Sequence, residues 1–326
     1  MNPSSPENIP LITVVIPVFN RIELLPRTLQ SVKAQSLRPL RLVIVDNGST
    51  ADCLNLLTDW KRENETADFI VDLTSAAKQG AAAARNAGLN SVTSEYVCFF
   101  DSDDEMRPNH LSRIADELRR CPSTDMLHFD IGILDPDGWL KIKTSDDSDL
   151  MRAHLFHGIF STARYVVRTS IAKSAGGWNE ELSLWDDLEF GTRLLLQNPV
   201  IGKLHGEPTA IIHADASDES ISGATYSARH GEGEKTLSAI EHLLSSTIHK
   251  KWIDCRRAIL AAHYRREGHK DLAHALLHPT LQKSGVADAL KLRSVYTAVW
   301  IAGQGGAFIG SLLYRPPKVK SPKNTD

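Results

Sequence analysis

The sequence predicts an α/β protein whose mostly parallel sheet is flanked by helices. Two observations predict this class. Short β-branched runs such as "LITVVIPV" at 11–18 alternate with segments whose apolar residues recur at helical spacing. The runs are apolar on both faces, which is typical of parallel strands covered by helices on both sides. In such sheets ligands bind beyond the carboxyl ends of the strands, so the residues that follow each strand are the first candidates for a site.

The β-branched runs predict the strands, and the helical spacing of apolar residues predicts the helices. Strands are predicted at 11–18, 40–46, 68–74, 95–101, 125–134 and 138–144, the last two flanking the turn signal "DPDG". Helices are predicted at 21–35 with Asn20 as N-cap, from Ser49 or Thr50 through Trp60, at 80–92, and after Pro108. From about residue 225 onward only helical patterns are found, which indicates a helical C-terminal region.

Composition excludes several classes of function. The 326 residues include 37 basic and 40 acidic side chains, a formal net charge of −3, which argues against a nucleic-acid-binding protein. The four cysteines are far apart and form no C-x-x-C pair, which argues against a zinc site or a disulfide framework and favours a reducing, cytoplasmic setting. Residues 1–9 lack the basic start and apolar run of a signal peptide and are expected to be a flexible lead-in.

Two acidic clusters are the strongest candidates for chemistry. The first, "DSDDE" at 101–105, directly follows a buried strand, while Asp46 ends a second strand and Asn20 follows the first. The second cluster, "WDDLE" at 185–189, opens a predicted helix whose core face carries Leu188, Leu195 and Leu196. Each cluster has a simple structural alternative, since acidic residues favour helix N-termini. Aspartates two residues apart can also share a hard cation such as Mg²⁺ or Mn²⁺, together with substrate phosphates.

Five motifs together resemble family-2 glycosyltransferases of the GT-A type, which have a Rossmann-like sheet. They are "TVVIPVFNR", "VIVDNGST", "GAAAARNAGL", "FFDSDDEMRPNHL" and "GGWNEELSLWDDLEFGTRLL", and the resemblance covers about residues 10 to 220. It implies transfer of a sugar from a nucleotide-sugar, with a UDP-sugar among the candidate donors, to an acceptor hydroxyl with inversion at the anomeric carbon. It also implies a Mn²⁺ or Mg²⁺ ion on the diphosphate. The chain has no P-loop motif and no G-x-G-x-x-G after its first strand, which argues against the other phosphate-binding classes.

The resemblance also implies roles for individual residues. In the D-x-D motif, Asp103 is expected to bind the metal, Asp101 to lie near the metal or the ribose, and Ser102 to line the donor site. The base is expected to lie against Pro17, Phe19, Asn20, Asp46 and Asn47. Asn47 stands where the family usually has a second aspartate. Two cations are expected near the diphosphate: Arg85, and Lys78 as a further candidate.

The second cluster matches the acceptor-activating motif of the family. Asp187 lies at the position of the catalytic base, and Asp186 replaces the usual glutamate before it. A base is needed because an acceptor hydroxyl is a poor nucleophile until its proton is removed. Trp185 is expected either to stack on an acceptor sugar or to fill the core. His213 is either a further metal ligand or a structural histidine.

The expected organisation is a GT-A domain at 10–223, a helical region at 224–314 and a basic tail at 315–326, with a mobile loop over 214–233. The expected acceptor is a glycan, a lipid-linked molecule or a protein. The uncharged stretch 296–314 and the basic residues after it suggest peripheral contact of 296–323 with a membrane, at the inner face of the cell membrane; a packed helix and a membrane span are the alternatives. Two other functions stay open: a catalytically silent sugar-nucleotide-binding relative, and a nucleotidyltransferase.

Overall fold

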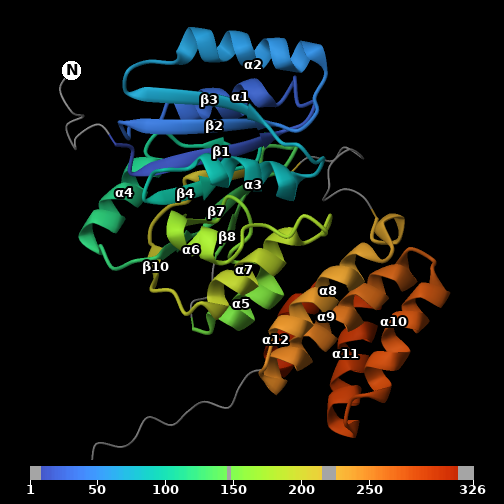
Figure 1. The fold of residues 1–326 in the computed structure, drawn as a ribbon. Coiled ribbons are helices and arrows are strands. Elements are labelled where there is room, and N and C mark those ends of the chain that lie inside the picture. Colours follow the sequence, from blue (N-terminus) through green and yellow to red (C-terminus); the bar gives the residue numbers. More distant parts are fainter. Residues whose placement is uncertain (1–8, 145–147, 215–224, 315–326) are drawn as a thin grey trace, which may run out of the picture. The chain divides into compact units, whose positions relative to one another are not determined.

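The computed structural model describes residues 9–144, 148–214 and 225–314 (Figure 1). The chain divides into two compact units. The first, which we call the α/β unit, consists of Met1–His154 and Gly158–Ala224. The second, which we call the helical unit, consists of Thr225–Asp326 together with Leu155–His157.

A seven-stranded sheet forms the centre of the α/β unit, in the order β10-β6-β9-β4-β1-β2-β3. Its strands are β1 (Ile12–Val18), β2 (Leu40–Asp46), β3 (Phe69–Ser75), β4 (Tyr96–Phe99), β6 (Met126–Phe129), β9 (Tyr165–Arg168) and β10 (Ile201–Leu204). All neighbouring pairs are parallel except those of β9, which is antiparallel to β4 and β6. This arrangement confirms the predicted mostly parallel sheet. It also brings the carboxyl ends of β1, β2 and β4 to the same edge (Figure 1).

Helices cover both faces of this sheet because successive strand residues point to opposite sides. Val14 belongs to the apolar cluster that α1 (Leu25–Lys33), α2 (Ala51–Asn64) and α4 (His110–Arg120) complete. Its neighbour Val15 belongs to the cluster that α3 (Ala81–Ser91), α6 (Thr169–Ser174) and α7 (Asp186–Leu196) complete. Gly88 of α3 allows this helix to approach closely, since a Cβ there would lie 2.3 Å from a methyl group of Val15.

A second, four-stranded sheet has the order β5-β11-β7-β8. Its strands are β5 (Glu105–Met106), β7 (Ile131–Leu134), β8 (Leu140–Lys143) and β11 (Ala210–His213). The hairpin β7–β8 contains the predicted "DPDG" turn. Because β5 begins at the last residue of the first acidic cluster, its antiparallel pairing with β11 brings His213 next to that cluster.

Some local predictions were wrong. The first helix begins at Leu25 with Leu24 as N-cap, so Asn20 does not cap it. The predicted strand 125–134 is two strands, β6 and β7, which belong to different sheets. Leu196 is 40% exposed and does not share the core face of α7; Phe190 and Leu194 are buried instead.

One helix, α5 (Leu150–His157), divides between the two units.

The helical unit contains α8 (Glu232–Leu243), α9 (Thr247–Arg266), α10 (Lys270–Gln282), α11 (Val286–Ala302) and α12 (Gly306–Leu313), after a short 3-10 turn, η2 (Ser227–Arg229). The stretch 296–314 is broken between α11 and α12, where Gly303 and Gly305 have positive φ angles of 77° and 85°. Over the described ranges, no helix is long and apolar enough to cross a membrane. Half of the predicted mobile loop at 214–233, residues 215–224, lies outside the described residues.

Candidate active site

The loops after β1, β2 and β4 are joined to one another at the carboxyl edge of the sheet. The Asn20 side chain accepts a hydrogen bond from the Thr50 amide at 2.7 Å, and the Asn20 amide donates to Ser49 Oγ at 3.1 Å. Asn20 has a φ of 50°, a left-handed conformation that asparagine tolerates better than most residues. The Arg21 guanidinium lies 3.9 Å from the Asp103 carboxylate. The predicted polar strand ends therefore lie together.

Asp46 and Asn47 shape the loop after β2. The two carboxylate oxygens of Asp46 accept hydrogen bonds from the amides of Gly48 and Ser49, at 3.1 and 3.2 Å. Asn47 donates to the carbonyl of Lys78 at 2.8 Å and accepts from the amide of Gly80 at 2.6 Å. An amide side chain carries both a donor and an acceptor, so asparagine makes a pair of bonds here that an ionised aspartate could not make.

Arg85 joins the two acidic clusters. It lies on α3 and is buried, and its guanidinium donates to Asp101 and to Asp186, each at 2.9 Å. Burial by itself would lower the pKa of Arg85, but the carboxylates of Asp101 and Asp186 outweigh this effect and raise it. Arg85 is therefore a fixed positive charge between residues that are 85 positions apart in the sequence.

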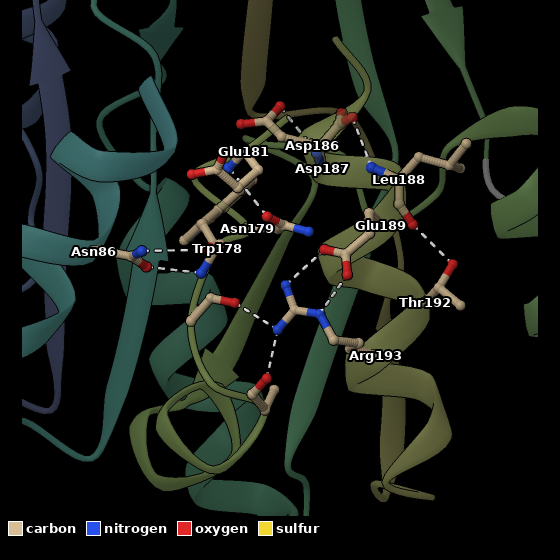
Figure 2. A network of polar contacts seen from close by, with 12 residues as sticks. Asn86, Trp178, Asn179, Glu181, Asp186, Asp187, Leu188, Glu189, Thr192 and Arg193 are labelled. Atoms are coloured by element: carbon tan, nitrogen blue, oxygen red, sulfur yellow. Dashed lines mark hydrogen bonds and ion pairs between the residues drawn. The ribbon is translucent and has the colours of Figure 1, made fainter. Parts of the chain in front are cut away.

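The Trp178 ring packs against this guanidinium. The indole ring lies 4.5 Å from the guanidinium carbon of Arg85, within the range of a cation–π contact. Figure 2 shows how Asn86, one residue after Arg85, holds the Trp178 backbone: its side chain donates to the Trp178 carbonyl at 2.9 Å and accepts from the Trp178 amide at 2.7 Å. Gly177 lies at this contact with a φ of 69°.

The second acidic cluster lies at the N-terminus of α7. Asp187 is partly buried, and its carboxylate accepts a hydrogen bond from the Leu188 amide at 2.8 Å. Burial, followed by the negative charge of Asp186, raises the pKa of Asp187 to about 6, against the opposing effect of Arg85. A carboxyl group with such a pKa accepts a proton more readily than an ordinary aspartate, as a general base requires.

Two further features fix the start of α7. Trp185, the residue before Asp186, has a φ of 58°, which is strained for a bulky side chain. Figure 2 also shows the ion pair one turn further on, where Glu189 and Arg193 make two hydrogen bonds, at 2.7 and 2.6 Å. Arg193 also donates to the Gly177 carbonyl at 2.6 Å, so it ties the helix to the Trp178 turn.

The two aspartates of the D-x-D motif, Asp101 and Asp103, repel each other. Burial and the charge of Asp101 raise the pKa of Asp103, and Arg21 only partly offsets them. Bringing a cation to these two carboxylates would relieve their repulsion, so they fit a hard divalent metal that takes its other ligands from phosphates and water. Among the described residues, no group of three potential metal-ligating side chains is assembled.

His213 lies next to the D-x-D loop but faces its far end. Its Nε2 is 3.3 Å from a carboxylate oxygen of Glu105, and its amide donates to the Asp104 carboxylate at 3.1 Å. Burial, followed by the charges of Asp101 and Asp103, raises the pKa of Asp104 well above its usual value. These contacts join His213 to Asp104 and Glu105, at the end of the loop.

Other predicted residues are distributed around this centre. Ser102 is buried within the loop, and Phe19, after β1, is 53% exposed at the same edge, where Pro17 is partly buried. Lys78 points toward the loop that precedes α7. There its ammonium group donates to the Glu181 carboxylate at 2.8 Å and to the Glu180 carbonyl at 3.2 Å. It therefore contacts neither the D-x-D motif nor Arg85 in any hydrogen bond or ion pair that the described residues make.

Sequence reasoning missed two residues of this centre. Trp178 lies beneath Arg85, and the "GGW" motif, with its paired glycines, is the signal that could have indicated a tight turn there. Tyr165 begins β9. Its buried hydroxyl has no hydrogen-bond partner among the described residues, and burial followed by the nearby charge of Asp187 raises its pKa. No pattern in the sequence relates Tyr165 to Asp187, because only the packing of α7 on the sheet brings the two residues near each other.

Comparison with known proteins agrees with this geometry. Residues 13–165 match the family described as Glycosyl transferase family 2. The amylovoran biosynthesis glycosyltransferase AmsB of Erwinia amylovora is 28% identical over 165 residues, which are 48% of this chain and 54% of that protein. The GalNAc(5)-diNAcBac-PP-undecaprenol beta-1,3-glucosyltransferase of Campylobacter jejuni is 29% identical over 105 residues, 32% of this chain and 33% of that protein. The chain thus spans about a third to a half of the length of these relatives.

Solved structures show the same fold over most of the chain. S. aureus TarS 1–349 in complex with UDP-GlcNAc aligns with 93% of this chain and 89% of its own, with a TM-score of 0.65 and 17% identity. The mannosyltransferase PcManGT from Pyrobaculum calidifontis, in complex with GDP-Man and Mn²⁺, aligns with 93% and 86%, with a TM-score of 0.57 and 16% identity. The fold is therefore of the GT-A type. Together with the family match over residues 13–165, it supports a family-2 glycosyltransferase.

Proposed function

We propose that this chain transfers a sugar from a nucleoside-diphosphate sugar to an acceptor hydroxyl, with inversion at the anomeric carbon. The observation that carries the proposal is the position of Arg85, whose guanidinium is 2.9 Å from both Asp101 and Asp186. One acidic cluster is thereby adjacent to the other. If the first cluster binds the donor diphosphate and the second binds the acceptor hydroxyl, the two reactants lie close together, as direct displacement requires.

The D-x-D motif would hold the donor. Asp103 and Asp101 would bind a divalent cation, which when bound offsets the charge that develops on the leaving diphosphate. The ion pair of the Asp103 carboxylate with Arg21 is long, at 3.9 Å, so the carboxylate has lone pairs left for a ligand. Arg85 would add a second positive charge at the diphosphate, and Phe19, Pro17 and the loop shaped by Asp46 and Asn47 would border the base.

Asp187 would act as general base. As the acceptor oxygen forms its bond to the anomeric carbon, the bond from that carbon to the diphosphate oxygen breaks, and the electron pair leaves with the diphosphate. The acceptor proton passes to the Asp187 carboxylate, whose pKa of about 6 suits this task near neutral pH. Asp186, which Arg85 binds, would hold the start of α7 in place.

The donor and acceptor classes follow from the names of similar proteins. TarS is described in complex with UDP-GlcNAc and PcManGT with GDP-Man and Mn²⁺. The Campylobacter relative is named for a sugar transfer to an undecaprenol-linked oligosaccharide, and the Erwinia relative for amylovoran biosynthesis. We therefore propose a nucleotide-sugar donor, of which a UDP-sugar is the first to test, and a glycan, lipid-linked or protein acceptor reached from the cytoplasm.

Calorimetric titration tests the donor site. The full-length protein is titrated with UDP, GDP and dTDP, each with and without Mn²⁺, and the titrations are repeated on Asp103→Ala. We expect one nucleotide to bind in a metal-dependent way, and the variant to lose at least about tenfold in affinity. An exposed aspartate on α4, Asp116, provides the control substitution Asp116→Ala, which should bind like the wild type.

Two results would contradict the proposal. Metal-independent binding that Asp103→Ala leaves unchanged would remove the D-x-D motif from the donor site. Metal-dependent binding without transfer of any sugar, from UDP-, GDP- or dTDP-sugars to isolated glycan, lipid-linked and protein acceptors, would instead favour the catalytically silent relative.

A further inference from the structure

The turn between α11 and α12 exposes large apolar side chains in the helical unit. We call this surface the apolar corner; it consists of Trp300, Ile301, Phe308, Leu312 and Leu313. Ile301 is 72% exposed and Phe308 is 62% exposed. Isolated exposed apolar residues are common, but a group of this size on two adjoining helices indicates an interaction surface.

The inner face of α12 explains why its apolar residues point outward. A Cβ at Gly306 would lie 2.3 Å from a Val299 methyl group, and one at Gly310 would lie 2.5 Å from the Cys255 sulfur. The two glycines are four residues apart and therefore share the face that packs against α9 and α11. Phe308 lies between them in sequence and falls on the opposite, exposed face.

The sequence segment that carries the corner is basic. Residues 294–314 contain no charged side chain, and residues 289–325 contain six basic side chains and no acidic one. Two arginines at the end of α9 adjoin the corner: Arg265 lies 5.2 Å from the Trp300 ring, and Arg266 donates to the carbonyls of Trp300 and Ile301 at 2.9 and 3.1 Å. An apolar surface bordered by basic residues complements an anionic lipid surface.

We propose that the apolar corner docks the protein on an anionic lipid bilayer. Phe308, Ile301 and Leu312 enter the interface between headgroups and acyl chains, Trp300 lies at the headgroup level, and the arginines meet the lipid phosphates. A second copy of the chain is a poorer occupant, because it would bring two sets of basic residues together without acidic residues in the same segment to offset them. This proposal is independent of sugar transfer.

Vesicle flotation tests the docking. Full-length protein is mixed with phosphatidylcholine vesicles that contain about one third phosphatidylglycerol, or none, at low and high salt. We expect flotation with the anionic vesicles, a loss of at least about fivefold in the bound fraction without phosphatidylglycerol, and a similar loss in high salt. Quenching of tryptophan fluorescence by brominated lipid should accompany binding and should be weaker in Trp300→Phe.

The chain offers a matched control. Ile301→Ser/Phe308→Ser changes the corner. Val286→Ser/Leu290→Ser changes residues that are 82% and 59% exposed toward the opposite end of α11, about 22 and 16 Å from Ile301 along the helix. The first variant should reduce vesicle binding about tenfold, and the second should bind like the wild type. Unchanged far-ultraviolet circular dichroism in both variants would show that folding is not the cause.

Three results would overturn the proposal. The first is wild-type protein that does not float with anionic vesicles. The second is an equal loss of binding in the corner variant and the control variant. The third is a concentration-dependent dimer in solution that only the corner variant abolishes, without vesicle binding by the wild type; the corner would then be a self-association surface.

Discussion

At the residue scale, the candidate site is an electrostatic arrangement around one buried guanidinium. Arg85 offsets the charges of Asp101 and Asp186 through direct hydrogen bonds. The charges of Asp186, Arg85 and Asp101 also act on Asp187, but among the described residues Asp187 makes no hydrogen bond to Arg85. Burial and repulsion from Asp186 therefore dominate the pKa of Asp187. Two adjacent aspartates thus have different environments, which is how neighbouring carboxylates acquire different functions.

Asp187→Asn tests the base at constant size. Loss of the proton acceptor should reduce transfer by about 10²- to 10⁴-fold, while nucleotide affinity stays within about twofold of the wild type. The rate of sugar transfer and the calorimetric affinity are the two measurements. Asp52→Asn is the control, because Asp52 also lies in the first turn of a helix, α2, but is exposed. Transfer unchanged in Asp187→Asn would exclude Asp187 as the base.

The pKa of Asp187 predicts a pH dependence. Only the carboxylate form accepts a proton, so kcat/KM should be constant above about pH 7 and should fall about tenfold per unit below pH 6. The profile should be measured from pH 5 upward on wild type and on the residual activity of Asp187→Asn, which should lack this step. A wild-type profile that stays flat below pH 6 would contradict the assignment.

The same shift affects stability. The pKa of Asp187 is higher in the folded protein than in the unfolded chain, so the folded state binds more protons than the unfolded state between about pH 4 and pH 6. The free energy of unfolding contributed by this group therefore falls as pH rises through that interval. Asp187→Asn should be more stable than the wild type at pH 7 by about 1–3 kcal/mol, with a smaller difference near pH 4.5. Urea denaturation at the two pH values measures this, and an equal gain in Asp52→Asn would show a general charge effect instead.

At the element scale, the turn at 176–178 joins α3 to α7. Asn86 on α3 holds the backbone of Trp178, and Arg193 on α7 binds the carbonyl of Gly177 (Figure 2). Trp178 in turn lies beneath Arg85 and packs against Phe190 of α7, with ring centroids 4.6 Å apart. The position of Asp186 and Asp187 at the start of α7 therefore depends on a turn that carries no charge of its own.

The paired glycines of this turn provide a matched test. Gly176 and Gly177 both have positive φ angles, 85° and 69°, so alanine is strained at either position. Only at Gly177 would the new Cβ lie 2.5 Å from Asn86 Oδ1; at Gly176 the nearest atom is 4.0 Å away. Gly176→Ala should cost about 1 kcal/mol, and Gly177→Ala about 2–3 kcal/mol with a larger loss of transfer. Urea midpoints compare the two, and equal midpoints would show that the contact with Asn86 is unimportant.

At the scale of the whole molecule, ligands should stabilise the α/β unit without being needed for its fold. Its core is complete among apolar side chains on both faces of the sheet. EDTA alone should therefore leave the thermal midpoint within about 1 °C. Mn²⁺ with a saturating nucleotide, at about 100 times its Kd, should add about 2.7 kcal/mol and raise the midpoint by several degrees. Scanning calorimetry measures both; a large drop with EDTA alone would indicate a structural metal.

Much of the α/β unit could be predicted from local pattern. Strand β2 has the predicted bounds, and the strands β1, β3 and β4 and the helices α2 and α3 are shifted by only a few residues. These elements have strong periods and clear turn residues. The split of 125–134 into β6 and β7 could not be predicted, because both halves are apolar and only their partners in two sheets distinguish them. The start of the first helix at Leu25 was missed because Asn20 is engaged with the loop after β2 instead.

The sequence by itself determined the class of fold, the two acidic clusters and the polar strand ends, because these depend on residues close together in the chain. Only the tertiary structure decided how they combine. Arg85 holds Asp101 and Asp186, Asn47 joins two loops, and Lys78 turns away to Glu181. Parallel strands bring distant loops to one edge, and which side chains pair there depends on distances and burial that no local pattern records. The pKa of Asp187 is a result of that packing.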